Sequence, residues 1–154
     1  MKLKSRKIVL WMFYLLIGFN TACINEGETS YGRWELYNDS NHSIEITIFE
    51  NFEKVKQINL KEKGSFWSSE VYKGDWGTTG LPPIFMVLEG DSLTITFDST
   101  RQAVFKTYAG TYDKFNIYQN ASYNTINESE TQYILRYTFT EADYENAEPI
   151  GAED

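Results

Sequence analysis

Cysteine, histidine and proline are scarce in this chain of 154 residues, which contains one cysteine, one histidine and three prolines. A single thiol cannot form an intramolecular disulfide, so the fold must be stabilised by core packing. One histidine and one cysteine are also too few for the ligand sets that hold zinc in proteins. The sequence carries no glycine-rich phosphate loop, dinucleotide-binding motif or Gly-x-Ser-x-Gly elbow. We therefore predict a protein that is not an enzyme and that uses no cofactor and no metal ion.

Long apolar runs are missing too, and the longest one lies near the N-terminus, at residues 8–19. At about 1.5 Å of rise per residue this run covers roughly 18 Å of helix, against about 30 Å for the core of a bilayer. It follows a basic segment and precedes small residues, which is the pattern of a secretory signal peptide. The basic residues are Lys2, Lys4, Arg6 and Lys7. We interpret residues 1–22 as a signal peptide that is removed on export.

The one cysteine, Cys23, directly follows Thr21 and Ala22. This arrangement resembles the signal peptides of bacterial lipoproteins, in which lipid is attached to the cysteine at the cleavage site. The position three residues before the cysteine holds Asn20, where those signals usually carry an aliphatic residue. The resemblance implies that Cys23 is lipidated, that residues 23–30 form a tether and that a membrane is a partner. Stable attachment takes two acyl chains or a second signal, and lipoprotein N-termini usually carry two or three chains.

Positive charge is in the minority, because 14 Lys and Arg residues stand against 22 Asp and Glu residues, for a net charge of −8. Removal of residues 1–22, which carry four basic residues and no acidic one, would shift the net charge to −12. An acidic surface is repelled by phosphate backbones, so we exclude nucleic acid as a partner. The charge itself is sufficiently explained by solubility.

Alternation of apolar and polar residues dominates the middle of the chain. Ile44, Ile46 and Ile48 alternate with polar residues, and the same period recurs at residues 93–97 and 133–139. A period of two, with β-branched and aromatic side chains, is typical of strands with one buried face. We expect further strands at Trp34–Tyr37, Val55–Leu60, Phe66–Tyr72, Ile84–Leu88 and Ala103–Tyr108, with an edge strand near Asn116–Tyr118. The strand at Ile84–Leu88, apolar throughout, would be central and covered on both faces.

About seven or eight short strands with few helical signals predict an all-β fold, an antiparallel β-sandwich of the immunoglobulin-like or a related type. We place this domain at residues 31–147 and interpret residues 148–154 as a frayed acidic tail. One short C-terminal helix is expected near Ala142–Ala147. Thr140 would cap it, and Asp143 would lie in its positively polarised first turn.

Candidate catalytic and metal-binding residues are few. His42 lies in a turn between two predicted strands, where a lone histidine is expected to be solvated. The turn Asn38-Asp39-Ser40-Asn41 offers oxygen ligands for calcium, but an Asx turn is the stronger interpretation. A pair of carboxylates in a cleft would be needed for a small hydrolase, and sequence spacing in a β protein cannot identify one.

The segment from Trp67 to Pro83 contains the aromatic residues and three glycines of a candidate binding loop. Trp76 could stack on a sugar ring, and nearby carboxylate and hydroxyl groups could bond its hydroxyls. The candidate ligand-binding residues are Trp67, Tyr72, Asp75, Trp76 and Thr78. The alternative is that these aromatic residues plug the end of the sandwich, since large aromatic side chains usually bury most of their area. The same two interpretations apply to a second aromatic cluster of Tyr108, Tyr112, Phe115, Tyr118 and Tyr123.

Three stretches of the chain, at residues 38–46, 90–98 and 137–144, resemble a group of small lipoproteins of unassigned function from Bacteroidetes-type bacteria. The resemblance covers most of the chain after Cys23 and implies an outer-membrane address, lipid-anchored and surface-exposed, with a periplasm-facing position as the alternative. Glu26 and Glu28 are similar to the acidic signal that such bacteria use to export lipoproteins to the outer face. Asp91-Ser92-Leu93 is similar to their O-glycosylation motif. No functional residues come with the resemblance.

The leading hypothesis from the sequence is an envelope-anchored, non-catalytic β-sandwich that acts as a binding or structural accessory at the cell surface. A glycan-binding surface module that uses the Trp76 loop is the second hypothesis. A small carboxylate-dependent hydrolase is the third. A subunit of a surface assembly is the fourth, so that the partner is either a glycan or another envelope protein.

Overall fold

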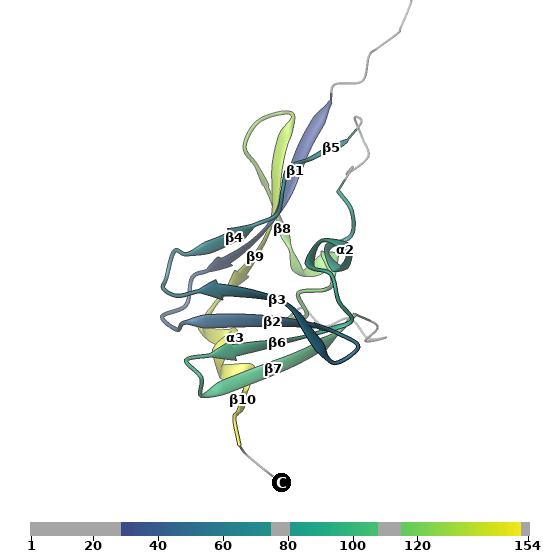
Figure 1. The fold of residues 1–154 in the computed structure, drawn as a ribbon. Helices are drawn as coiled ribbons and strands as arrows, with labels where there is room; N and C mark the ends of the chain where they lie inside the picture. The colour runs from purple at the N-terminus through teal and green to yellow at the C-terminus, as the bar shows by residue number, and fades with distance from the viewer. Residues whose placement is uncertain (1–28, 75–80, 108–114, 152–154) are drawn as a thin grey trace, which may run out of the picture.

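A computed structural model describes residues 29–74, 81–107 and 115–151 of the chain. Ten strands in this part form two sheets (Figure 1). The first sheet has the order β4 (Phe66–Ser68), β1 (Ser30–Asn38), β9 (Gln132–Phe139) and β8 (Asn124–Asn127), and β5 (Tyr72–Gly74) also pairs with β1. The second sheet has the order β10 (Glu148–Pro149), β7 (Arg101–Lys106), β6 (Ser92–Phe97), β2 (Ile44–Glu50) and β3 (Glu53–Leu60). The predicted all-β sandwich with a short C-terminal helix is confirmed.

The core lies between the two sheets and is built by the alternation seen in the sequence. In β2 the isoleucines are buried while the intervening polar residues face outward, and β6 repeats the pattern. The first sheet contributes the buried aromatic residues Trp34, Tyr137 and Phe139. The Trp34 indole is satisfied by donating to the carbonyl of Pro82 at 3.0 Å.

The pairing of β1 with β9 is parallel over eight residue pairs, from Tyr31–Gln132 to Asn38–Phe139. All other strand pairs are antiparallel. The prediction of a purely antiparallel sandwich therefore misses one pair. Parallel neighbours need a long crossover connection, and here most of the domain forms it.

The prediction of a central strand at Ile84–Leu88 is wrong, because these residues form the short helix α2. Pro83 precedes the helix, and proline cannot continue a ladder of strand hydrogen bonds. Ile84, Val87 and Leu88 are buried, which is the i, i+3, i+4 spacing of a helix face. An all-apolar run fits a buried strand and a helix equally well, so the sequence does not separate them.

Two other strand predictions need correction. The expected strand Phe66–Tyr72 is interrupted, because Ser69 closes the end of β4 by hydrogen bonds with the Trp34 backbone, and β5 begins only at Tyr72. The expected edge strand Asn116–Tyr118 is a buried turn in which the Asn116 side chain accepts the Tyr118 N–H at 3.0 Å. Strand β8 takes the edge position in the first sheet instead.

The C-terminal region holds α3 (Glu141–Asn146), preceded by the expected capping residue Thr140. The Asp143 carboxylate accepts the N–H of Thr140 at 2.8 Å and its hydroxyl at 2.8 Å. The chain then continues into β10, so the first residues of the predicted acidic tail pair with β7. Strand β10 lies at the opposite end of the molecule from the start of β1 (Figure 1).

Gly90 has a positive φ of 88°, and a Cβ there would lie 2.5 Å from the carbonyl oxygen of Phe49. We expect Gly90→Ala to lower the free energy of unfolding in urea by the cost of a left-handed residue, about 1 kcal/mol, plus roughly 1–3 kcal/mol for the clash. Gly64→Ala is the matched control, since Gly64 has a φ of 89° and its nearest neighbour, the Tyr37 hydroxyl, lies at 4.0 Å. Equal losses for the two variants would contradict the clash at Gly90.

Candidate functional site

Of the predicted ligand-binding segment, the structure describes residues 67–74 and 81–83. Trp67 in β4 and Tyr72 in β5 are partly buried and pack against the core. The ammonium group of Lys56 lies 5.0 Å from the centre of the Trp67 ring. Asp75, Trp76 and Thr78 lie outside the described residues, as does Cys23. A ligand-binding role for the loop stays a prediction, and the two described aromatic residues contact the core instead of forming an exposed platform.

The second aromatic cluster divides into core residues and one residue at a surface cleft. Tyr118 and Tyr123 are buried, and burial raises the pKa of both hydroxyls. The Tyr123 hydroxyl donates to the carbonyl of Ile117 at 2.8 Å. Phe115 lines the cleft described below. Tyr108 and Tyr112 lie outside the described part of the chain.

The turn after β1 is an Asx turn, as the stronger interpretation of Asn38-Asp39-Ser40-Asn41 predicts. The Asn38 side-chain oxygen accepts the N–H of Ser40 at 2.9 Å, and its amide donates to the carbonyl of His42 at 2.8 Å. Both Asn38 and Ser40 are fully buried. The side-chain oxygens of Asn38 and Ser40 are thus hydrogen-bonded within the turn. These bonds orient the His42 side chain.

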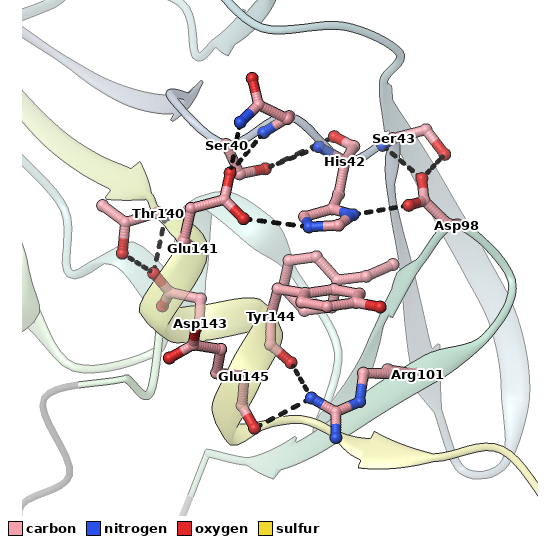
Figure 2. A network of polar contacts seen from close by, with 12 residues as sticks. Ser40, His42, Ser43, Asp98, Arg101, Thr140, Glu141, Asp143, Tyr144 and Glu145 are labelled. Atoms are coloured by element: carbon pink, nitrogen blue, oxygen red, sulfur yellow. Dashed lines mark hydrogen bonds and ion pairs between the residues drawn. The ribbon is translucent and has the colours of Figure 1, made fainter.

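His42 is not a solvated turn residue, which corrects the prediction from the sequence. Its Nδ1 lies 2.6 Å from Asp98, and its Nε2 lies 3.0 Å from Glu141 (Figure 2). The imidazole also stacks on the Tyr144 ring, with 3.6 Å between the ring centres and 7° between the planes. Its side chain is 19% exposed. We call the set of His42, Asp98, Glu141 and Tyr144 the histidine clamp.

The electrostatics of the histidine clamp favour the charged forms of His42, Asp98 and Glu141. The hydrogen bond to Asp98 raises the pKa of His42 above its usual value, and Glu141 acts in the same direction, against the opposing effect of burial. The His42 ring in turn lowers the pKa of the Asp98 carboxyl. The backbone N–H of Asn41 is the main cause of the lowered pKa of Glu141. His42 therefore keeps its proton to a higher pH than a free imidazole does.

The histidine clamp holds α3 against the second sheet. Glu141 and Tyr144 belong to α3, whereas Asp98 follows β6. Arg101 of β7 adds to the attachment, because its guanidinium lies 5.1 Å from the Tyr144 ring and donates to the Tyr144 carbonyl at 2.9 Å. A six-residue helix is too short to be stable by itself in water. The position of α3 thus depends on these contacts.

On its other side, α3 forms a wall of a surface cleft with a volume of about 400 Å³. The cleft runs between α3 and the edge of the second sheet at β7. Apolar rings form much of its lining, contributed by Phe97, Phe105, Phe115 and Phe139. Polar groups line the rest, from Gln102, Asp143, Asn146 and Glu148. A cavity of this size, lined by both apolar and polar groups, is typical of a ligand site.

The polar groups of the cleft and clamp do not form a metal site. Within the described residues, no group of three His, Cys, Asp or Glu side chains is arranged to hold a metal ion. In the clamp, the carboxylates of Asp98 and Glu141 contact opposite sides of the His42 ring and so do not converge on one point.

Comparisons with protein-family models, with curated proteins and with solved structures found no match for this chain. In the part of the chain that the structure describes, no helix is long and apolar enough to cross a membrane.

The histidine clamp predicts a pH dependence of stability. Because the pKa of His42 is raised on folding, its contribution is fully present below its unfolded value of about 6.5 and is lost as the pH rises through the folded value. The free energy of unfolding in urea should therefore be lower at pH 9 than at pH 6. His42 is the only histidine in the chain, so His42→Gln should remove most of this difference. A variant that keeps the full pH dependence would exclude the clamp as its cause.

Proposed function

We propose that this protein is an envelope-anchored lipoprotein whose β-sandwich is a non-catalytic binding accessory at the cell surface, with the cleft between α3 and β7 as its binding site. The anchor rests on the signal-like segment 1–22 and on Cys23. The binding site rests on a single observation, the cleft of about 400 Å³ lined by four phenylalanines. An outer-membrane, surface-exposed address completes the proposal, with a periplasm-facing position as the alternative.

The cleft is suited to an apolar ligand or side chain, because Ala103 and Phe105 line it and are only partly buried. Phe97 and Phe139 are buried to about 1% exposure or less and form its floor. An apolar group that covers exposed apolar surface gains about 25 cal/mol for each Å² removed from water. The wall residue Asp143 has both oxygens engaged by Thr140 and Tyr137. Recognition in this cleft would thus rest on shape and apolar contact.

The histidine clamp supports a structural role in preference to a catalytic one. A general acid needs a raised carboxyl pKa, whereas the pKa values of Asp98 and Glu141 are both lowered. Both nitrogens of His42 are engaged by these carboxylates, which leaves the ring no free lone pair to act as a base. The hydrolase hypothesis gains no support from this cluster.

The glycan-binding hypothesis gains no support from the described aromatic residues either. Trp67 and Tyr72 are partly buried against the core, whereas a sugar-binding platform presents ring faces to solvent. The remaining candidates, Asp75, Trp76 and Thr78, lie outside the described residues. We therefore place the binding site in the cleft.

Lipid anchoring predicts the outcome of Cys23→Ser. Without the thiol no lipid can be attached, so the variant should leave the membrane fraction or persist as an uncleaved precursor. Fractionation of cells followed by mass measurement separates these cases. Unchanged fractionation and unchanged mass would refute the anchor.

The cleft predicts the binding of a neutral apolar fluorophore, 1-N-phenylnaphthylamine, with increased fluorescence. Ala103 lines the cleft and packs against the core, so Ala103→Leu should fill part of the cleft and weaken binding about tenfold, which corresponds to about 1.4 kcal/mol. Thr94→Leu is the control, because Thr94 pairs with Val104 on the outer face of the second sheet. A failure of the native chain to bind the fluorophore would overturn the cleft as a binding site.

A further inference from the structure

Strand β7 has a free backbone edge beside the cleft. In an antiparallel pair, residues alternate between those bonded to the neighbouring strand and those whose N–H and C=O groups point to the other side. The N–H of Thr107 donates to the carbonyl of Asp91, so every second residue of β7, counted back from Thr107, bonds to β6. By this register the backbone groups of Gln102, Val104 and Lys106 point away from β6.

Strand β10 uses only the beginning of this edge. Glu148 pairs with Gln102, and Pro149 pairs with Arg101. The N–H of Ile150 extends the contact to the carbonyl of Thr100 at 2.9 Å. Among the described strands, none lies beside Val104 or Lys106 on that side of β7. Within residues 29–74, 81–107 and 115–151, the outward main-chain donors and acceptors of these two residues therefore have no strand partner.

The free edge and the apolar cleft are parts of one surface. Val104 and Phe105 both line the cleft, as do Ala147 and Glu148 at the point where β10 begins. Side chains alternate between the two faces of a strand. A strand added beside β7 would end before Glu148, which already pairs with Gln102. The residue of this strand opposite Phe105 would point toward the cleft, on the same side as the Phe105 side chain. The one opposite Val104 would point outward.

We propose that the cleft is a strand-addition site for an extended peptide of a partner protein, which pairs with Val104 and Lys106 of β7 and inserts apolar side chains among the phenylalanines. This inference rests on the proposed binding function of the cleft and names its class of ligand. Main-chain hydrogen bonds supply affinity in this mode of recognition, and pockets for alternate side chains supply specificity. The pairing of β10 with the same edge shows that it accepts an antiparallel strand.

The charges around the site indicate the flanking residues of the peptide. Glu148 is exposed at the rim of the cleft, and the chain as a whole carries a net charge of −8. Lys106 lies on the β7 edge itself, and like charges directly opposite each other destabilise a pair of strands. A peptide with an acidic residue opposite Lys106 therefore fits this surface better than one with a basic residue there. The apolar positions are two residues apart, since only alternate side chains face the cleft.

The test uses tetrapeptides of sequence X-Glu-X-Thr-amide, with a fluorescent label on the N-terminus and Phe, Leu, Ile, Val, Tyr or Trp at each X. In an antiparallel pair the Glu lies opposite Lys106 and the Thr opposite Val104, so the peptide ends before Glu148, which pairs with Gln102. Binding is measured by fluorescence polarisation of the full chain in detergent. The control peptides are identical except for an N-methyl group on the threonine, which removes the donor opposite Val104. We expect binding by members with aromatic or large aliphatic X residues. N-methylation should weaken it about tenfold, the factor for a loss of about 1.4 kcal/mol.

Two variants at one position examine the edge of β7 itself. Val104→Pro removes the outward N–H and leaves the bonds to β6, and proline is tolerated on an edge strand in this orientation. Val104→Thr changes the side chain and keeps the N–H. Peptide binding should fall about tenfold in Val104→Pro and stay within about twofold of native in Val104→Thr. The melting temperature of each variant shows whether the fold is intact. If Val104→Pro unfolds, the N-methylated peptides decide alone.

The outcomes separate the peptide inference from the proposed function. Binding that is insensitive to N-methylation would overturn strand addition. Absence of binding by every peptide, in a chain that still binds 1-N-phenylnaphthylamine, would overturn the peptide and leave the cleft as a site for small apolar molecules. Absence of both kinds of binding would overturn the proposed binding function. Displacement of the fluorophore by the unmethylated peptides alone is the result that supports strand addition in the cleft.

Discussion

The parallel pairing of β1 with β9 is the constraint on which the remaining structure depends. It places Asn38 beside Phe139 at the last position of both strands, and the N–H of Asp39 continues the contact to the Phe139 carbonyl at 2.9 Å. Because the strands run in the same direction, the segments that follow them leave the sheet side by side. One segment is the turn that carries His42, and the other begins α3. The histidine clamp is therefore a direct consequence of the sheet topology.

Helix α3 converts this topology into a binding surface. Its six residues bury little apolar area, and its stability derives from the Thr140–Asp143 cap and from the contacts of Tyr144 with His42 and Arg101. Its end at Asn146 also fixes the point at which the chain can join the second sheet. Strand β10 consequently begins at Glu148, and no other described strand pairs with the rest of that β7 edge. The wall of the cleft and the length of the free edge are thus set by one helix.

The features that the sequence predicts correctly depend on neighbouring residues. The alternation at residues 44–48 and 93–97 identifies strands, and Thr140 with Asp143 identifies the cap of a helix. Prediction fails where two local structures fit the same residues, as at Ile84–Leu88, which is short and apolar enough for a strand or a helix. The flanking prolines Pro82 and Pro83 are the signal that favours the helix. It also fails where strands distant in sequence pair, because no local pattern distinguishes a parallel partner from an antiparallel one.

The histidine clamp is not predicted from the sequence for the same reason, because its members lie far apart along the chain. His42 contacts Asp98 and Glu141, which lie 56 and 99 residues away in the sequence. No local pattern in the sequence therefore links the three residues. An unpaired strand edge has no sequence signature either, because it is defined by where a neighbouring strand stops. Natural sheets usually protect such edges with short strands, charged residues or covering segments, since an open edge invites pairing with other chains. Here β10 covers Arg101 and Gln102, whereas no strand among the described residues pairs with the outward side of Val104 and Lys106, beside the cleft. The charge of Lys106 and the short length of this edge are better suited to selective pairing with a short peptide than to unrestricted association.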